Sequence, residues 1–475
     1  MKQSFLIVLL IACAHTAAAA EPAAPAPASR AALCSTVVME DDFLTGAAAL
    51  EALAQQACAE KPELCVPDGA NREAFLRLNA ALLAESGKIS RPALEAFFKD
   101  GAQPNQCELY ELAYIFDALL LKRISDSVSA GAGSALDKVQ RLTDWTFEHI
   151  ALSSPLQAQR AATRPVYPLD IIEQGHGFDF QIAWALAALV QQQGLAVALA
   201  YLPPADGSVI TRVLVLVFLE EGSVLVDPVH GIVWKDASTH KPIGIREALE
   251  KTKRIKKLHS QYDSAMVKSL KKAEFRIPYH PLALLPKMKT VQSVLAETCA
   301  VQPLLYVDLT RAHNAFGHLF CRAEGMESFN YSPELMQFTL PGRDYSCSVW
   351  LMPLVQLFAS GLPQAPQYRE GRRMHLRGEY DQASLNYRRA LSYADEAEQR
   401  AELTFFLGLL EYDRGDYEKA AFTLQRYLDR YYKSRQDHVR FLLARIYQLQ
   451  GNREKSAEFM QLLRDNPRYE RFLKP

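Results

Sequence analysis

The sequence lacks an excess of charge of either sign, and this limits the classes of protein to which it can belong. Lysine and arginine total 53 against 54 acidic residues, which gives a formal net charge of −1 at pH 7. A chain balanced in this way has no global positive field to attract a nucleic-acid backbone. Hydrophobic residues make up 49% of the 475 positions, so the chain can bury the cores of roughly three domains.

Cysteine is scarce, and its distribution excludes several chemistries. The eight cysteines include no Cys-x-x-Cys pair, which argues against zinc ribbons and thioredoxin-type redox sites. None lies between Cys107 and Cys299. The motifs of phosphate loops, zinc proteases and serine hydrolases are absent as well. We therefore expect neither a cofactor nor a resident metal ion.

Long hydrophobic runs are missing except at the start of the chain. Residues 1–20 combine Lys2, an apolar run and a series of alanines, a pattern typical of a secretory signal cleaved after Ala20. The run is too short to span a bilayer. We expect an extracytoplasmic protein, periplasmic or secreted. The alternative is a membrane-anchored lipoprotein, because Leu10-Ile-Ala-Cys13 resembles a lipoprotein box with Cys13 as the lipidated residue.

Composition and apolar spacing divide the rest of the chain. Apolar residues three and four apart predict helices over 47–59, 72–83, 91–98, 109–121 and 136–150. The expected organisation is a signal peptide (1–20), a Pro/Ala-rich tether (21–33), a helical domain (34–135), an α+β domain (136–245), a mixed connecting region (246–360) and a helical repeat region (361–475).

The α+β domain shows one apolar helix followed by consecutive strands. An alanine-rich helix is predicted over 181–193 and ends at Gly194, and β-type runs follow at 196–202, 213–219 and 223–226. Residues 245–260 are rich in lysine and predict one further helix. Strands that follow one another after a helix favour an α+β fold rather than a doubly wound sheet.

The C-terminal region contains an internal repeat. Gly415 follows Gly378 by 37 residues, and Gly451 follows Gly415 by 36. Each unit reads as two helices joined by a turn, and the region resembles a tetratricopeptide array of three units. Gly371, Gly378, Tyr380, Ala383, Tyr387 and Ala390 recur as Gly408, Gly415, Tyr417, Ala420, Leu424 and Tyr427, and in degraded form as Ala444, Gly451, Arg453, Ser456, Met460 and Leu463.

The stretch 177–183 and the strands after it resemble the core of transglutaminase-like domains, which are papain-like thiol enzymes. When Gly194 is placed at the family's helix-ending glycine, Asp179 stands where that family has its cysteine. Arg212 stands at the histidine position, and Asp227 matches the aspartate that orients the histidine. The resemblance therefore implies a papain-like core whose triad is degenerate at two of three positions.

The substitutions remove the chemistry but keep the charges. A thiolate–imidazolium pair is replaced by a carboxylate and a guanidinium, and arginine cannot act as a general base. We expect an ion-pair cluster of Asp179, Arg212 and Asp227, serving either to hold the helix on the sheet or to bind a peptide or carboxylate ligand. A metal site would have to gather His176, Asp179, Asp227 and His230, and no two of these share a ligand spacing on one helix.

These features together predict a function in binding. We expect an exported, non-catalytic scaffold or assembly protein of the bacterial envelope, whose protein or peptide partner lies in the groove of the repeat array. One alternative is a hydrolase or amidase that uses Asp179 in place of a thiol, and this requires a raised pKa of Asp179 in an open cleft. A second alternative is a sensor whose cleft binds a cell-wall fragment.

Overall fold

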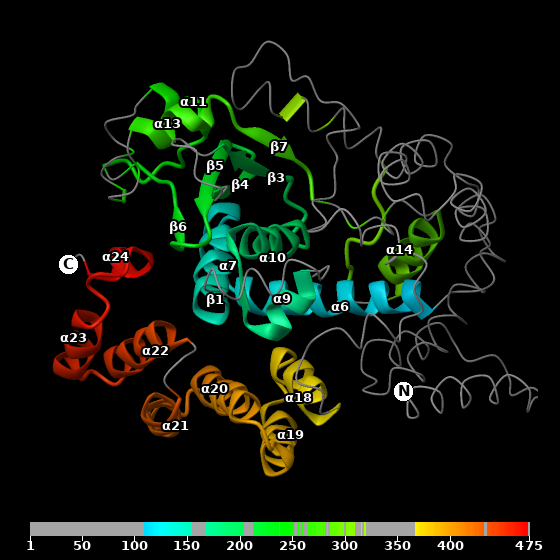
Figure 1. Ribbon diagram of the computed structural model, residues 1–475. Helices are drawn as coiled ribbons and strands as arrows, with labels where there is room; N and C mark the ends of the chain where they lie inside the picture. Colours follow the sequence, from blue (N-terminus) through cyan, green and yellow to red (C-terminus); the bar gives the residue numbers. More distant parts are fainter. Residues whose placement is uncertain are drawn as a thin grey trace, which may run out of the picture.

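The structure is a computed structural model, shown in Figure 1. It describes residues 109–153, 168–203, 212–236, 238–250, 264–278, 286–298, 301–308, 366–431 and 435–473, with isolated positions between 255 and 319. The described residues form a mixed α/β structure, about 63% helical with small sheets, compatible with the expected α+β class. The expected signal peptide, tether, first three helices and every cysteine lie outside the described residues.

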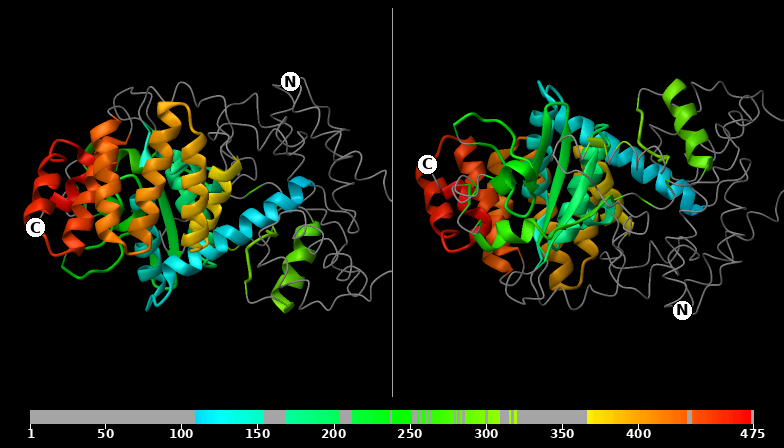
Figure 2. Two further views of the ribbon diagram at one scale, coloured as in Figure 1. Left: turned by 90° about the horizontal axis from the view of Figure 1, so that it is seen from below. Right: turned by 90° about the horizontal axis from the view of Figure 1, so that it is seen from above.

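The described elements form three layers: a sheet, a middle layer of helices and a curved helical array (Figures 1 and 2). The middle layer contains α7, α9 and α10, and the array runs from α18 to α23. The helices are α6 (Leu109–Ser129), α7 (Ala135–His149), α9 (Pro168–Gln174), α10 (Asp179–Gln191), α11 (Ile245–Glu250), α13 (Ser264–Leu270), α14 (Pro286–Thr298), α18 (Pro366–Leu376), α19 (Tyr380–Tyr393), α20 (Ala397–Asp413), α21 (Tyr417–Arg430), α22 (Gln436–Leu449), α23 (Arg453–Gln461) and α24 (Glu470–Leu473), with a 3₁₀ turn η4 at Pro467–Tyr469.

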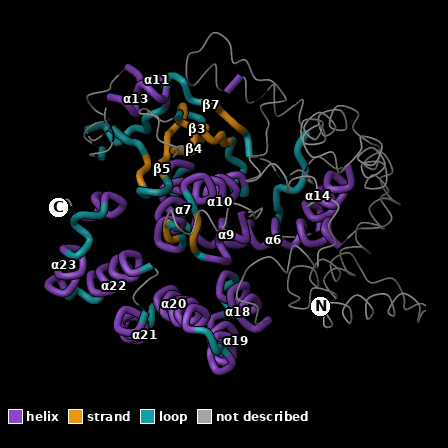
Figure 3. The backbone as a smooth tube through the Cα atoms, viewed as in Figure 1, coloured by secondary structure: helices purple, strands orange, loops and turns teal. Residues whose placement is uncertain are grey.

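The main sheet has five antiparallel strands in the order β6-β5-β4-β3-β7, which Figure 3 shows as orange segments. Its strands are β3 (Val197–Leu202), β4 (Arg212–Leu219), β5 (Gly222–Asp227), β6 (Ile232–Val233) and β7 (Glu274–Arg276), and a separate parallel pair joins β1 (Ala151–Leu152) to β2 (His176–Gly177). Residues 213–218 of β4 are all buried, as expected for a central strand covered on both faces. In Figure 1 the helices α11 and α13 lie above the sheet and α10 lies below it.

Helix α10 is mostly apolar because most of its side chains are buried. Its alanines at 183, 185 and 187 are fully buried and let the helix lie close to β3 and β4. The Gln181 side chain accepts a hydrogen bond from the backbone N–H of Phe178 at 3.0 Å and fixes the first turn. The chain leaves the helix through Gly194, whose φ of +75° favours glycine. The helix predicted over 181–193 is therefore confirmed, shifted two residues toward the N-terminus.

Other sequence predictions in this part of the chain are confirmed or extended. The helix predicted over 136–150 is α7, and the three predicted strands are β3, β4 and β5. Helix α6 continues past residue 121 because Ser125 and Ser129 turn inward, and the Ser125 hydroxyl donates to the Leu189 carbonyl of α10 at 2.7 Å. The sheet includes β7, so it extends beyond residue 245. Of the lysine-rich helix expected over 245–260, the structure describes α11.

The array consists of three helical hairpins, α18–α19, α20–α21 and α22–α23, which agree with the three units of the repeat. The small repeat residue Gly408 is required by packing, since a Cβ at this position would lie 2.6 Å from Leu424 of α21. The turn glycines Gly378, Gly415 and Gly451 have φ between +77° and +86°. The glycines of the repeat therefore serve two purposes: one allows the two helices of a unit to pack closely, and the other forms the turn after the first helix. Within the described residues, no helix is long and apolar enough to cross a membrane.

Candidate functional site

The three positions singled out by the sequence lie at one end of the layer between α10 and the sheet. Asp179 is the first residue of α10, Arg212 the first of β4 and Asp227 the last of β5. The charge of Arg212 acts on the pKa of both carboxyls, and the charge of Asp227 acts on the pKa of Asp179, as charges in one small region do. The predicted juxtaposition of helix start and strand ends is therefore present.

Asp227 is the centre of this site. Its Oδ2 accepts a hydrogen bond from Nδ1 of His230 at 2.9 Å and another from the Tyr262 hydroxyl at 2.9 Å, and its Oδ1 accepts the backbone N–H of His230 at 3.1 Å. Burial alone would raise the pKa of this carboxyl, but the charge and hydrogen bonds of His230 hold the pKa well below its usual range. Asp227 is thus a buried carboxylate with its acceptors satisfied.

The ion-pair partner of Asp227 in the described part of the chain is His230, a residue that the expected cluster of Asp179, Arg212 and Asp227 did not include. The Arg212 guanidinium lies 5.9 Å from the ring centre of Tyr262, and its Nη1 is 3.6 Å from Sδ of Met266.

The pKa of Asp179 is shifted in the opposite direction from that of Asp227. Burial raises the pKa of its carboxyl, and repulsion by Asp227 raises that pKa further, against the smaller influence of Arg212 and His230. Asp179 is therefore a carboxyl that takes up a proton more readily than usual, beside an imidazole oriented by Asp227.

Aromatic side chains and the end of the chain enclose the pair of Asp227 and His230. The ring centres of His230 and His259 are 4.5 Å apart, and those of Trp234 and Tyr262 are 4.8 Å apart. Nε2 of His259 donates to the carbonyl of Pro467 at 3.0 Å. Sequence reasoning considered His230 only as a metal ligand. The signal that could have identified its role was its place three residues after the aspartate, in the same turn.

The C-terminal segment reaches the same site from the array. Arg468, which is 3% exposed, donates from Nη2 to the carbonyl of Ile150 at 2.7 Å, and its guanidinium lies 4.7 Å from the ring centre of Phe147. Its charge acts on both Asp179 and Asp227. Arg471 donates to the carbonyl of Gly231, in the turn that carries His230. The expected cleft is thus covered on this side by residues of the same chain.

The inner helices of the array contact the core, mainly by completing the ends of its helices. Carbonyl groups in the last turn of an α-helix have no partner within the helix and favour cationic donors. Side chains of the array and of the C-terminal segment supply these donors for α7 and α9: Arg372 to Ile172 (3.1 Å), Arg435 to Gln174 (2.9 Å), His438 to Glu148 (2.9 Å) and Arg468 to Phe147 (3.4 Å).

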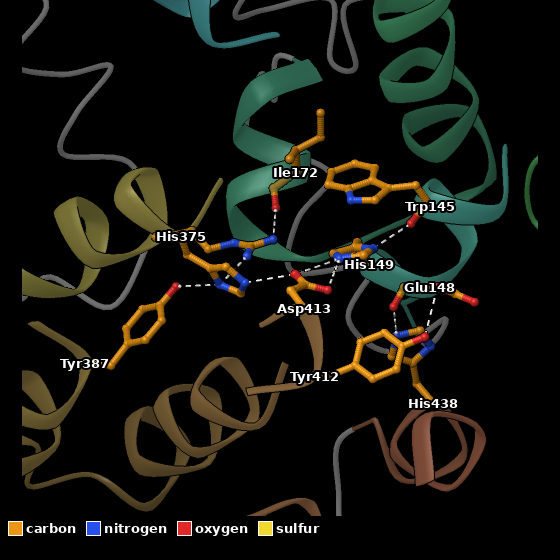
Figure 4. A network of polar contacts seen from close by, with 10 residues as sticks. Trp145, Glu148, His149, Ile172, His375, Tyr387, Tyr412, Asp413 and His438 are labelled. Atoms are coloured by element: carbon orange, nitrogen blue, oxygen red, sulfur yellow. Dashed lines mark hydrogen bonds and ion pairs between the residues drawn. The ribbon is translucent and has the colours of Figure 1, made fainter. Parts of the chain in front are cut away.

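A buried polar network lies at the middle of this contact (Figure 4). The Asp413 carboxylate of α20 lies 3.0 Å from Nε2 of His149 and 2.9 Å from Nε2 of His375. Arg372 donates to Nδ1 of His375 at 3.0 Å, so the hydrogen of this imidazole is on Nε2 and points at Asp413. Nδ1 of His149 faces the carbonyl of Trp145 at 2.8 Å. The network joins α7, α18 and α20 in one hydrogen-bonded unit.

A metal site does not form among the described residues, where no group of three or more His, Cys, Asp or Glu side chains is arranged to hold an ion. His176 lies in β2 and contacts the Ser153 hydroxyl at 3.1 Å, apart from the pair of Asp227 and His230. Comparison of the chain with protein families, with curated proteins and with solved structures finds no match.

Proposed function

We propose that this chain is an exported, non-catalytic binding protein of the bacterial envelope. In this proposal the core is a degenerate transglutaminase-like domain. The end of the core that corresponds to the family's catalytic site, around Asp179, Arg212 and Asp227, serves as the contact with a tetratricopeptide-like array. The buried pair of Asp227 and His230, covered by the C-terminal segment, supports a structural role for that end. The inner face of the array contacts α7 and α9 of the same chain, so we assign the partner to the outer face.

The observation that carries this assignment is a repeated pair of side chains on the outer helices. Leu385 of α19 and Phe422 of α21 are 47% and 65% exposed and lie 37 residues apart, at the same position of successive units. Arg389 and Arg426 follow them by four residues, one helical turn away. The Arg426 guanidinium lies 5.6 Å from the ring centre of Phe422. The matching partner is a protein segment that carries apolar and acidic side chains.

The test is photo-crosslinking in cells with the full chain and a crosslinking residue at position 422. We expect one partner to be captured, and its capture to fall when Leu385→Ser is added to the same chain. Leu462→Ser is the matched control, because Leu462 is 58% exposed and lies outside the repeated pair. Capture that is indifferent to Leu385, or equal capture from a crosslinker at Glu221 on the core, would contradict the assignment.

A second candidate function is favoured by one observation, the raised pKa of Asp179 next to the pair of Asp227 and His230. A carboxyl with a raised pKa near an oriented imidazole can form a general acid–base pair of the kind found in hydrolases. The full chain would be assayed on a panel of peptide amides and esters. Hydrolysis that is lost in both Asp179→Asn and His230→Gln, with unchanged folding, would establish this function in place of the first.

A further inference from the structure

The C-terminal segment, residues 467–473, contains the same pair of side chains twice. Arg468 and Tyr469 are followed three residues later by Arg471 and Phe472. The segment forms η4 and α24, and Figure 1 shows α24 beside β6 of the core, at the end of the chain. Arginine and aromatic residues are the side chains that most often anchor protein segments in binding sites.

Both arginines of this pattern donate hydrogen bonds to the core. Nη2 of Arg468 donates to the carbonyl of Ile150 at 2.7 Å, and Arg471 donates to the carbonyl of Gly231. Nη2 of Arg471 also pairs with the Asp144 carboxylate of α7 at 2.9 Å. The two guanidinium groups are thus held by two separate parts of the core, the end of α7 and the turn between β5 and β6.

Both aromatic residues of the pattern pack on the same two rings. The ring centre of Phe147 in α7 lies 5.7 Å from that of Tyr469 and 5.3 Å from that of Phe472. The corresponding distances from Phe441 of α22 are 5.3 and 4.7 Å. The guanidinium groups of the two arginines lie 4.7 and 5.1 Å from the Phe147 ring centre. Phe147 is therefore the centre of the surface that receives all four side chains.

The chain reaches this segment through exposed residues. The Arg464 and Asp465 side chains before it are 65% and 91% exposed, and the residues of α24 are half-buried. The buried anchors are Arg468 and Tyr469, which are 3% and 2% exposed. The segment is thus joined to the array by an exposed link and anchored to the core by two buried side chains.

The segment lies at the end of the core that holds the pair of Asp227 and His230. Nε2 of His259, whose ring lies against that of His230, is 3.0 Å from the carbonyl of Pro467 and 3.3 Å from a carboxylate oxygen of Glu470. The acceptor of Arg471, Gly231, follows His230 in the chain. The segment therefore covers the expected cleft from the side of the array.

We propose that the C-terminal segment is a ligand held by its own chain. The surface beneath it, the Phe147 surface (Asp144, Phe147, Ile150, Gly231 and Phe441), recognises protein segments of the pattern Arg-aromatic-x-Arg-aromatic. The C-terminal segment blocks this surface until a competing segment of the same pattern displaces it. A ligand tethered by a short link acts at an effective concentration on the order of millimolar, so the competitor must bind more tightly than the segment alone.

The competing ligand is a different protein rather than a second copy of this chain. A second copy would bring the same segment and would gain no contact over the one already in place. The Phe147 surface is also separate from the outer face of the array, whose partner carries acidic side chains. The inference therefore stands or falls independently of the partner assigned to that face.

The test uses the full chain with a protease recognition sequence inserted between Arg464 and Asp465. The folded chain is cut, and the released segment is removed by gel filtration. The probe is a fluorescent peptide of residues 466–473, and its anisotropy measures binding. We expect the cut chain to stay folded and to bind the probe at least about tenfold more tightly than the uncut chain, which holds its own segment. Saturating probe is expected to restore the melting temperature that cutting lowers.

Matched variants locate the binding. A probe with Arg468→Met and Arg471→Met is expected to bind the cut chain at least about tenfold more weakly. Asp144→Asn in the cut chain is expected to weaken binding of the parent probe by about threefold or more. Asp137→Asn is the control, because Asp137 lies on the same helix, is 40% exposed and pairs with Arg141.

Four results would overturn the proposal. They are unfolding of the cut chain, equal affinity of the cut and uncut chains for the probe, equal affinity of the two probes, and an effect of Asp144→Asn no larger than that of Asp137→Asn. A dimer of the uncut chain that is lost in Arg468→Met would overturn it as well, because the segment would then belong to a second copy.

Discussion

The pKa values of Asp179 and Asp227, two carboxyls in one small region, are shifted in opposite directions. Asp227 accepts three hydrogen bonds and is held ionised by His230, whereas the pKa of Asp179 is raised by burial and by Asp227 itself. The same conservative change at each position should therefore have opposite effects on stability. Comparing the two variants tests whether the Asp227 carboxylate stabilises the fold while the Asp179 carboxylate destabilises it.

We expect Asp227→Asn to lower the free energy of unfolding by about 3 kcal/mol at pH 7, because an amide cannot accept all three hydrogen bonds. Asp179→Asn is expected to raise it by about 1 kcal/mol, because a carboxyl whose folded pKa is raised destabilises the fold wherever it is ionised. This gain should shrink as the pH falls toward 4, where the unfolded carboxyl is also protonated. Urea unfolding at pH 7 and pH 4 measures both effects, and equal losses in the two variants would contradict the assignment.

For these residues, the sequence predicted their places in the fold but not their hydrogen-bond partners. Asp179, Arg212 and Asp227 could be placed at one end of α10 and the sheet, because a helix ending at Gly194 and three apolar strands fix that geometry. The partner of Asp227 could not be deduced. Local turn geometry brings His230 to the carboxylate, and Arg468 arrives from the end of the chain, more than two hundred residues away.

Among elements, the ends of α7 and α9 determine how the array meets the core. Their last carbonyls receive donors from Arg372 of the first unit, from Arg435 and His438 of the third unit and from Arg468 of the C-terminal segment. Repeat periodicity predicted the hairpins correctly, because packing and turn residues recur within each unit. It could not predict this contact, since the donor side chains are not repeated: Arg372, His438 and Arg468 occupy unrelated positions of the pattern.

We expect Arg468→Met to lower the free energy of unfolding by about 2 to 4 kcal/mol, because the carbonyls of Phe147 and Ile150 lose their donor in a buried setting. Arg464→Met is the control. Its side chain is 65% exposed and pairs with the exposed Asp465, so we expect a loss below about 0.5 kcal/mol. Similar melting temperatures for the two variants would contradict the role assigned to Arg468.

Both the core and the array contain buried histidines whose lowered pKa keeps them neutral at pH 7. Burial lowers the pKa of His375 to about 4, although Asp413 opposes this, and burial lowers the pKa of His176 to about 3. A histidine whose folded pKa is lowered destabilises the fold when the pH falls below the unfolded value of about 6.5. Acid should therefore loosen the contact between array and core.

We expect the melting temperature to fall steadily between pH 6.5 and pH 4, with core and array unfolding in one transition because they share the buried network around Asp413. His375→Gln keeps a polar side chain without the titration and is expected to flatten this dependence. Scanning calorimetry across the pH range measures both. Two separate transitions at neutral pH, or a dependence unchanged in the variant, would contradict the prediction.

The return of the chain to the core has a consequence for the length of the array. In an open solenoid a unit can be added at either end, because each unit contacts only its neighbours. Here the segment after α23 must bring Arg468 to the carbonyl of Ile150 and Arg471 to the carbonyl of Gly231. An inserted unit would carry both arginines past these acceptors, and a deleted one would leave them short. These contacts with the core therefore limit how many hairpins can lie between α18 and the C-terminal segment, and the structure describes three.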